Sequence, residues 1–150
     1  MQLTGLIAAP HTPFNPDFTL NLEVVPLQAR QLAVSGVKGV FVAGTTGECH
    51  SLTANERMEL FGAWAREAPK HEMKFIAHVG CNNLPESRDL AKAALEVGAD
   101  AIGAMAPTFF KPTGVEGLID WFERITEPAA ALPFYFYDIP SMTGVSIDTA

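Results

Sequence analysis

The stretch Gly39-Val40-Phe41-Val42-Ala43-Gly44-Thr45-Thr46-Gly47-Glu48 decides the fold of this chain. Its first half is an apolar run, which is typical of a buried strand. Its second half has two glycines, which allow a tight turn and a close approach of the backbone to a ligand. The two threonines add hydroxyl and N–H donors, which suit a carboxylate. An ordinary glycine-rich turn between a strand and a helix has the same composition, so both interpretations stay open.

Similar apolar segments recur along the chain, and helical segments alternate with them. We predict strands over residues 3–9, 40–43, 75–80, 99–106 and 134–137. We predict helices over residues 21–35, 53–67, 83–98 and 113–125. Strands that are apolar almost throughout and alternate with helices are typical of a parallel sheet covered by helices.

Three of the predicted helices begin with a capping signal. Thr53 with Glu56, and Thr113 with Glu116, have the spacing of a capping box, in which side chains and backbone at the helix start satisfy one another. Asn83 is placed to cap the third helix. These signals fix where the chain leaves each loop and enters a helix.

Two architectures fit this alternation. A doubly wound open sheet can close within 150 residues, whereas an eight-stranded barrel needs roughly 250. Length alone therefore favours the open sheet.

Composition limits the partners of the protein. The chain has 150 residues, of which 48% are hydrophobic and 18% charged, and its formal net charge is −7. This acidic balance argues against nucleic acid and against an anionic membrane as partners, and no apolar run approaches the length of a membrane-spanning helix. Residues 1–4 lack the features of a signal peptide, and Cys49 and Cys81 have no metal-ligand spacing. We therefore expect a cytoplasmic protein with reduced thiols.

Four motifs occur together in the order and spacing of a known family. They are Gly44-Thr45-Thr46-Gly47-Glu48, Ala77-His78-Val79-Gly80, Ala106-Pro107-Thr108-Phe109-Phe110-Lys111-Pro112 and Tyr137-Asp138-Ile139-Pro140. On these residues, essentially the whole chain resembles the dihydrodipicolinate synthase and N-acetylneuraminate lyase family. The family fold is α/β, a (β/α)8 TIM barrel. The resemblance therefore implies, against the length argument, that residues 1–150 are the N-terminal part of a single barrel domain and cover roughly strands 1–5.

Within the family, residues 76–80 and 132–140 are most similar to the N-acetylneuraminate lyase branch. Synthases of the family usually carry an arginine two residues after the proline of the Tyr-x-x-Pro motif. Here that position is Met142, so a bidentate clamp for a dicarboxylic substrate is missing. The resemblance implies a Schiff-base aldolase, a carbon-carbon lyase that cleaves N-acetylneuraminate to pyruvate and N-acetylmannosamine.

Two alternatives remain beside this interpretation. One is another pyruvate-dependent aldolase, dehydratase or synthase of the same family, such as a 2-keto-3-deoxy sugar acid aldolase or a dihydrodipicolinate synthase. The other is a binding barrel without catalysis. The residues that separate these classes fall mostly after the fifth strand.

The resemblance also implies residue roles. Thr45, Thr46 and Gly47 match the loop that binds the carboxylate of a small-molecule 2-oxo acid, and Tyr137 matches the tyrosine that relays protons beside the imine. Tyr137 and Thr46 are the expected catalytic residues. Because barrel sites lie at the carboxyl ends of the strands, we expect these residues to share one cavity there. No cofactor and no metal ion is expected.

The reaction that the family catalyses needs a lysine. Its amine attacks the C2 ketone and loses water, and the protonated imine then draws electrons from the breaking C3–C4 bond. A base takes the proton from the C4 hydroxyl.

The family places this lysine on the sixth strand. Lys38 and Lys74 precede strands and belong to the opposite end of the sheet, Lys70 lies in a helix-to-strand connection, and Lys92 lies on a helix. Lys111 is on the loop side of the site but outside the strands. We therefore expect the nucleophile to lie beyond residue 150, and the chain to be a fragment of a longer enzyme.

Several other side chains have structural interpretations. Phe109 and Phe110 cannot carry a proton, and we expect their rings to pack at an interface. Relatives assemble as tetramers or dimers, so the resemblance implies a homo-oligomer. His78 is expected to be a hydrogen-bonded interior residue, and Cys49 and Cys81 to be small buried apolar residues.

Overall fold

A computed structural model describes residues 3–147 of the chain. Its five strands form one parallel sheet in the order β1-β2-β3-β4-β5, so each strand pairs with the next one along the chain. The strands are β1 (Ile7–Ala8), β2 (Gly39–Val42), β3 (Lys74–His78), β4 (Ala101–Ala104) and β5 (Phe134–Phe136). The helices are η1 (Leu22–Val24), α1 (Val25–Val34), α2 (Ala54–Glu67), η2 (Ala68–His71), α3 (Leu84–Glu96), α4 (Gly114–Thr126), η3 (Glu127–Ala129) and α5 (Pro140–Thr143).

The strand order decides between the two architectures. A doubly wound sheet reverses its strand order at a switch point, whereas a barrel adds every strand beside the preceding one. The order observed here never reverses. The expectation of a doubly wound sheet from chain length is therefore wrong, and the sheet is built as a segment of a barrel.

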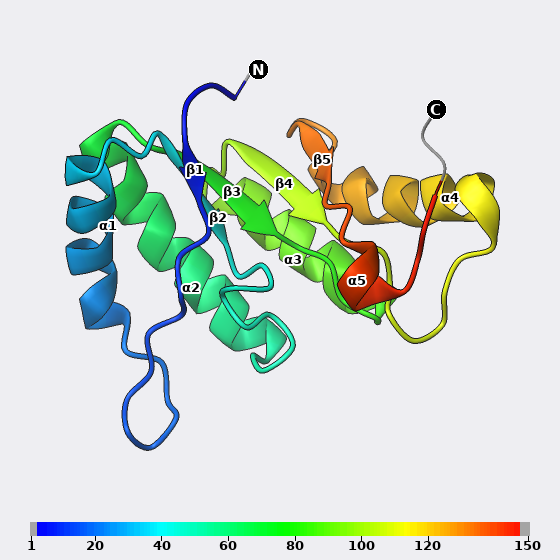
Figure 1. Cartoon of the computed structure of the whole chain (residues 1–150), viewed down its shortest axis with the longest axis horizontal. Coiled ribbons are helices and arrows are strands. Elements are labelled where there is room, and N and C mark those ends of the chain that lie inside the picture. The colour runs from blue at the N-terminus through cyan, green and yellow to red at the C-terminus, as the bar shows by residue number, and fades with distance from the viewer. Residues whose placement is uncertain (1–2, 148–150) are drawn as a thin grey trace.

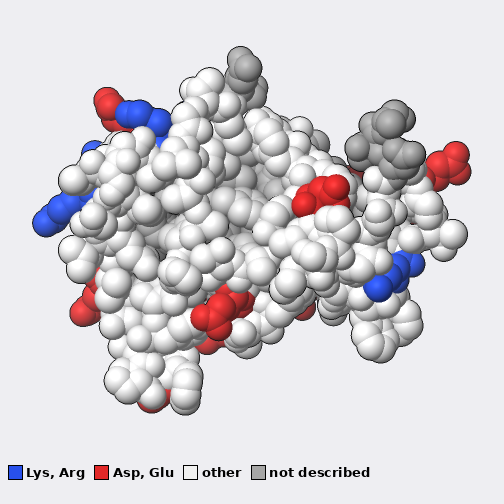
Figure 2. Space-filling model, viewed as in Figure 1, with Lys and Arg blue, Asp and Glu red and all other residues white. Residues whose placement is uncertain are grey.

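Helices cover one face of the sheet, and the other face is open (Figure 1). Alternate strand residues point into the helix layer and form its core, among them Val40, Val42, Phe75, Ala77 and Ile102. The residues between them face the open side, where Phe41, Ile76 and Tyr135 line a hollow of about 350 Å³. Figure 2 shows that this face is hollowed near its middle and that charged side chains stand mostly at its margin. In a closed barrel this face is the interior.

Two of the three predicted helix caps form. Thr53 and Glu56 make the complete capping box of α2, and the side chain of Asn83 accepts a hydrogen bond from the backbone N–H of Glu86 at the start of α3. The box predicted at Thr113 is wrong, because this side chain makes no cap hydrogen bond. Gly114, the next residue, has a left-handed φ of 68°, which turns the following N–H groups away from the Thr113 hydroxyl.

Glycines and a proline set the remaining boundaries. The strand predicted over residues 3–9 shrinks to β1, because Gly5 with φ 84° bends the chain just before it. The helix predicted over residues 21–35 divides into η1 and α1, and Pro26 lies in the first turn of α1. Among residues 3–147, none of the helices combines the length and the hydropathy that crossing a bilayer requires.

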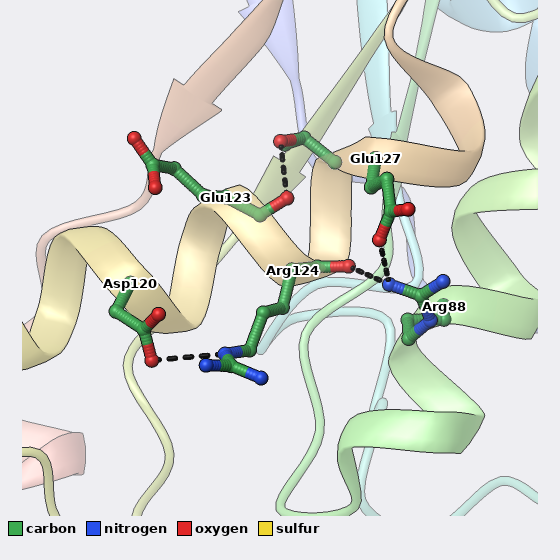
Figure 3. Close-up of polar contacts among 6 residues, drawn as sticks. Arg88, Asp120, Glu123, Arg124 and Glu127 are labelled. Atoms are coloured by element: carbon green, nitrogen blue, oxygen red, sulfur yellow. Dashed lines mark hydrogen bonds and ion pairs between the residues drawn. The ribbon is translucent and has the colours of Figure 1, made fainter.

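An ion pair and a hydrogen bond join α3 to α4 and η3 (Figure 3). Arg88 of α3 donates to the backbone carbonyl of Arg124 at the end of α4 and to the Glu127 carboxylate in η3, at 2.6 and 2.7 Å. Arg124 is itself paired with Asp120, one turn earlier in α4. These contacts fix α4 against α3, and α4 leads the chain into β5.

Candidate functional site

The loop after β2 is compact because two of its positions have room only for glycine. A methyl group at Gly47 would lie 2.9 Å from Cα of Ala43, and one at Gly44 would lie 2.9 Å from the Phe41 ring. Ala43 and Glu48 bracket this turn with left-handed φ angles of 54° and 57°. Non-glycine residues adopt this conformation uncommonly, so the surrounding contacts must hold them there.

Three hydrogen bonds fix the loop. The hydroxyl of Thr12, a residue only 6% exposed in the segment after β1, donates to the carbonyl of Gly47 at 2.7 Å. Within the loop, the N–H of Cys49 donates to the carbonyl of Gly44 at 3.2 Å, and the N–H of Glu48 donates to the carbonyl of Thr45 at 3.0 Å. The segment after β1 thus supports the segment after β2.

Thr45 and Tyr137 meet at the carboxyl ends of β2 and β5. The phenol of Tyr137 donates to the hydroxyl of Thr45 at 3.3 Å, across 92 positions of sequence. The backbone N–H of Tyr137 donates to the carbonyl of Ala104, which continues the pairing of β5 with β4. The ring of Phe41 packs edge-on against that of Tyr137, with centroids 5.3 Å apart. Tyr137 is therefore oriented by both its backbone and its ring.

The two predicted site segments border neighbouring hollows. Thr45 lines a cleft of about 340 Å³, together with Met105 and Thr108 after β4 and Met142 of α5. Tyr137 lines the hollow of about 350 Å³ over the open face of the sheet. Thr46 is exposed and Gly47 is buried, so Thr45 is the member of the predicted trio that contacts Tyr137. The expectation that these residues share one cavity is therefore wrong for the described residues, because Thr45 and Tyr137 line different hollows and meet only through their hydroxyl groups.

A buried cluster of His78 and Arg57 lies next to the loop. His78 at the end of β3 is fully buried, and its Nδ1 lies 2.9 Å from the carbonyl oxygen of Ala43. The prediction that His78 is a hydrogen-bonded interior residue is confirmed. Arg57 of α2, 1% exposed, donates to the carbonyl of Gly80 and to that of His78. Burial and the nearby Arg57 charge hold the pKa of His78 well below 6.5.

The two cysteines differ in environment. Cys49 is buried, as predicted, and burial raises the pKa of its thiol. Cys81 is half-buried and its sulfur contacts the Ser87 hydroxyl at 3.1 Å, so the prediction of a buried apolar role is wrong for Cys81. In residues 3–147, no three His, Cys, Asp or Glu side chains are grouped so that they could hold a metal ion.

Asn82 organises the loop after β4. Its side-chain oxygen accepts from the N–H groups of Thr108 and Phe109 at 2.7 and 3.1 Å, and its amide donates to the Thr108 hydroxyl. Beyond this clamp, Phe109 and Phe110 stack edge-to-face and are 77% and 85% exposed. The loop thus presents two uncovered rings on a fixed base.

Lys111 lies away from the cleft that Thr45 lines. It is exposed, and its ammonium lies against Gly144, where a methyl group would come within 2.5 Å of it. It borders a separate hollow of about 200 Å³.

Sequence reasoning missed three residues that build this region, namely Thr12, Arg57 and Asn82. A usable signal existed for Arg57. Together with Leu60, Phe61 and Trp64 it forms the buried stripe of α2, with the i, i+3, i+4, i+7 spacing of a core face. An arginine in such a stripe indicates a buried charge with a specific partner. Thr12 and Asn82 lie in loops without any such pattern.

Comparisons with known proteins agree with this geometry. The family model described as the dihydrodipicolinate synthetase family matches residues 2–150. N-acetylneuraminate lyase of Danio rerio is 39% identical over 150 residues, which are 99% of this chain and 49% of the relative.

Two solved structures extend the similarity to three dimensions. The N-acetylneuraminate lyase (sialic acid aldolase) of Aliivibrio salmonicida superposes with a TM-score of 0.93 at 35% identity, over 98% of this chain and 48% of that one. A dihydrodipicolinate synthase of Cyanidioschyzon merolae, solved with lysine bound, gives 0.88 at 32% identity, over 94% and 47%. The prediction of an α/β TIM-barrel fold is confirmed. The chain spans about half the length of the relatives that it matches.

Proposed function

This chain belongs to the dihydrodipicolinate synthetase family, and from that premise we propose that residues 1–150 are the N-terminal part of a single (β/α)8 barrel domain. The consecutive strand order and the mostly apolar hollow of the open face support this domain assignment. In the whole protein, further strands close the ring and cover Phe41, Ile76 and Tyr135. The alternative of a complete small domain requires this apolar face to remain in water, which is unfavourable.

The whole protein is a class I aldolase that cleaves N-acetylneuraminate to pyruvate and N-acetylmannosamine. The observation that carries this proposal is the contact between the Tyr137 phenol and the Thr45 hydroxyl at the carboxyl ends of two strands. It joins a tight, donor-rich loop to a group that can move a proton. The relatives of nearly 40% identity that are named as N-acetylneuraminate lyases support the choice of substrate.

The donors of the loop from Thr45 to Gly47 hold the carboxylate of the 2-oxo acid. Thr45 contacts Tyr137, and the exposed Thr46 adds a hydroxyl on the solvent side of the same turn. An anion prefers several converging N–H and O–H donors, which this turn supplies without a cationic side chain. Holding the carboxylate there orients the adjacent C2 ketone for attack.

Tyr137 relays protons at the reacting centre. Formation of the imine releases water from the carbinolamine, so the departing hydroxyl must receive a proton. Cleavage of the C3–C4 bond removes a proton from the C4 hydroxyl. A phenol hydrogen-bonded to Thr45 can give and take protons in these steps. The nucleophilic lysine belongs to a strand that follows residue 150. Lys111, which borders a separate hollow, is not that residue.

Trapping the imine tests both the reaction class and the place of the lysine. The whole protein is incubated with pyruvate and reduced with borohydride, and the adduct is located by peptide mass spectrometry. We expect one modified lysine outside residues 1–150, and pyruvate release from N-acetylneuraminate in a parallel assay. A protein without an adduct is a binding barrel, and an adduct on Lys111 contradicts the placement of the nucleophile. An adduct without N-acetylneuraminate cleavage favours another pyruvate-dependent enzyme of the family.

The protein also works as a homo-oligomer. Phe109 and Phe110 support this proposal, because two stacked aromatic rings more than three-quarters exposed are unusual outside an interface. Light scattering of the whole protein should give a multiple of the monomer mass, and replacement of both rings by serine should lower it. An unchanged mass in the double variant contradicts a role for these rings.

A reducing, cytoplasmic location is proposed on the two free thiols, of which Cys49 is buried next to the site. Fractionation of the source cells with an antibody against the whole protein tests this location.

A further inference from the structure

His78 holds the carbonyl group at which the loop begins. Its Nδ1 is 2.9 Å from the oxygen of Ala43, the residue with φ 54° that precedes Gly44. A carbonyl oxygen can only accept, so this contact is a hydrogen bond when the imidazole carries its proton on Nδ1 and donates it. A fully buried ring thus contacts the residue whose left-handed conformation begins the turn.

Arg57 holds His78 and keeps its ring uncharged. Its Nη2 is 3.2 Å from Nδ1 of His78, and it also donates to the carbonyl of His78 at 2.5 Å. When Nδ1 donates to Ala43, the contact with Arg57 joins two donors and is no hydrogen bond. It places a positive charge against the ring and so disfavours the imidazolium, whose pKa lies well below 6.5. His78 is thus a neutral donor with its lone pair on Nε2.

Further contacts hold His78 and Arg57 in this arrangement. A second donor bond of Arg57 reaches the carbonyl of Gly80 at 3.2 Å, so the guanidinium fixes the chain on both sides of Val79. Nε2 of His78 has no hydrogen-bond partner among residues 3–147. The edges of the Phe41 and Tyr137 rings pack around the imidazole, with centroid distances of 5.6 and 6.1 Å. The same ring therefore contacts both halves of the candidate site.

We propose that His78 and Arg57 are positioning residues for the carboxylate-binding loop, with Arg57 holding His78 and the Nδ1–H of His78 holding the carbonyl of Ala43. The proposal rests on the proposed function, because it assigns the loop of Thr45 a bound carboxylate. Neither residue touches the substrate. Their effect is to keep the threonine donors where the carboxylate is held.

A purely structural role in the core predicts a different outcome from a positioning role. Loss of core packing lowers stability, and so the fraction of folded protein, without changing the affinity of the folded site. Loss of positioning raises the pyruvate concentration that half-saturates imine formation in the protein that remains folded. The two roles are separable by measuring both quantities on the same variants.

Two substitutions at His78 differ in whether they keep a nitrogen that can donate to the carbonyl of Ala43. In His78→Asn the side-chain amide nitrogen can occupy the place of Nδ1 and donate to Ala43, whereas His78→Leu removes the donor and keeps most of the volume. In the whole protein, we expect half-saturation by pyruvate to rise about tenfold to a hundredfold in His78→Leu, the range for a displaced site. His78→Asn should stay near the wild type. Equal values in the two variants would overturn the proposal.

Arg57→Met tests whether Arg57 acts through His78. If it does, Arg57→Met and His78→Leu are not additive, and the double variant half-saturates close to the worse single variant. Effects that multiply would show that Arg57 acts independently and overturn its assignment. Leu90→Ala, at a fully buried position of α3, is the control. It should lower the melting temperature and leave half-saturation unchanged.

The ring state can be measured without any activity. Selective ¹⁵N-histidine labelling of the whole protein, with the His78 signal assigned by its loss in His78→Asn, reports which nitrogen is protonated. We expect a neutral ring with the proton on Nδ1, unchanged from about pH 8 to about pH 6. A proton on Nε2 would overturn the proposal. If the wild type forms no imine, the proposed function fails, while the Nδ1–H result still decides whether His78 holds Ala43.

Discussion

Replacing Gly47 by alanine perturbs the loop directly, because the added methyl group would press against the backbone of Ala43. The nearest atoms are Cα and N of Ala43, at 2.9 and 3.0 Å, and both belong to the backbone. A favourable contact between carbon atoms needs about 3.5 Å or more. The methyl group is therefore about 0.6 Å too close, and the chain must move.

The contacts of the loop determine what that movement costs. The carbonyl of Gly47 is held at 2.7 Å by the buried Thr12 hydroxyl, and Ala43 is held by His78, so neither side yields freely. Overpacking of this kind typically costs about 1–3 kcal/mol. A displacement of about 0.5–1 Å at a binding group can reduce catalysis by up to about a hundredfold. We expect Gly47→Ala to lose both stability and pyruvate affinity.

The same chemical change at Gly62 is the matched control. Gly62 lies inside α2, and a methyl group there would meet only the end of the Arg66 side chain, at 3.5 Å. Because alanine is the better helix former, Gly62→Ala should stabilise the protein by about 0.5–1 kcal/mol without affecting the site. Denaturant unfolding and half-saturation by pyruvate, measured on both variants of the whole protein, provide the test. If Gly47→Ala behaves like Gly62→Ala, the tight loop geometry is not what the site requires.

Three further predictions follow from single contacts. Tyr137→Phe removes the phenol that meets Thr45, so kcat for pyruvate release should fall about 10²–10⁴-fold with little change in half-saturation; an active variant would exclude the relay role. Thr53→Ala removes the side-chain half of the α2 capping box and should lower the free energy of unfolding by about 1 kcal/mol in urea titrations; no loss would mean that the box contributes nothing. His78 is buried with a folded pKa well below its unfolded value of about 6.5, so the unfolded chain takes up this proton first as the pH falls. The stability that neutral His78 provides is complete above about pH 6.5 and declines below it, by up to about 1.4 kcal/mol per pH unit. The difference in unfolding free energy between wild type and His78→Asn, followed from pH 7 to pH 5, measures this slope. A difference that stays constant contradicts the prediction.

Local signals in the sequence predicted most of the fold. All five strands and the four main helices were expected within a few residues of their observed positions, because apolar runs and caps such as Thr53 act over short distances. The errors came from backbone conformations that the sequence pattern does not reveal. Gly5 shortened β1, and Gly114 prevented the Thr113 cap, since both take up left-handed φ angles.

The choice of architecture had to come from similarity. A parallel sheet of alternating strands and helices is compatible with an open or a closed arrangement, and length pointed to the wrong one. The order of the strands is set by long-range pairing, of which residue composition carries no trace. Four motifs in register corrected this expectation, because they reflect the whole fold and not a local preference.

The sequence indicated the loop residues of the predicted site but not the residues that support them. Thr45 and Tyr137 were identified from the family resemblance, because a donor-rich turn and a strand-ending phenol also occur as ordinary structural features. Thr12, which supports the loop, contacts Gly47 across 35 positions of the chain. Arg57 is proposed to support the loop through His78. Such supporting contacts depend on which segments the fold brings together, so a pattern in the local sequence cannot show them.

The uninterrupted strand order has a consequence for biosynthesis. Every strand joins the one just made, so the sheet can grow from its first strand as the chain leaves the ribosome. The turn around Thr45 can form as soon as β3 is added, whereas Tyr137 follows Thr45 by 92 residues. If the proposed roles hold, a nascent chain completes its carboxylate-binding turn well before the residue that relays protons is made.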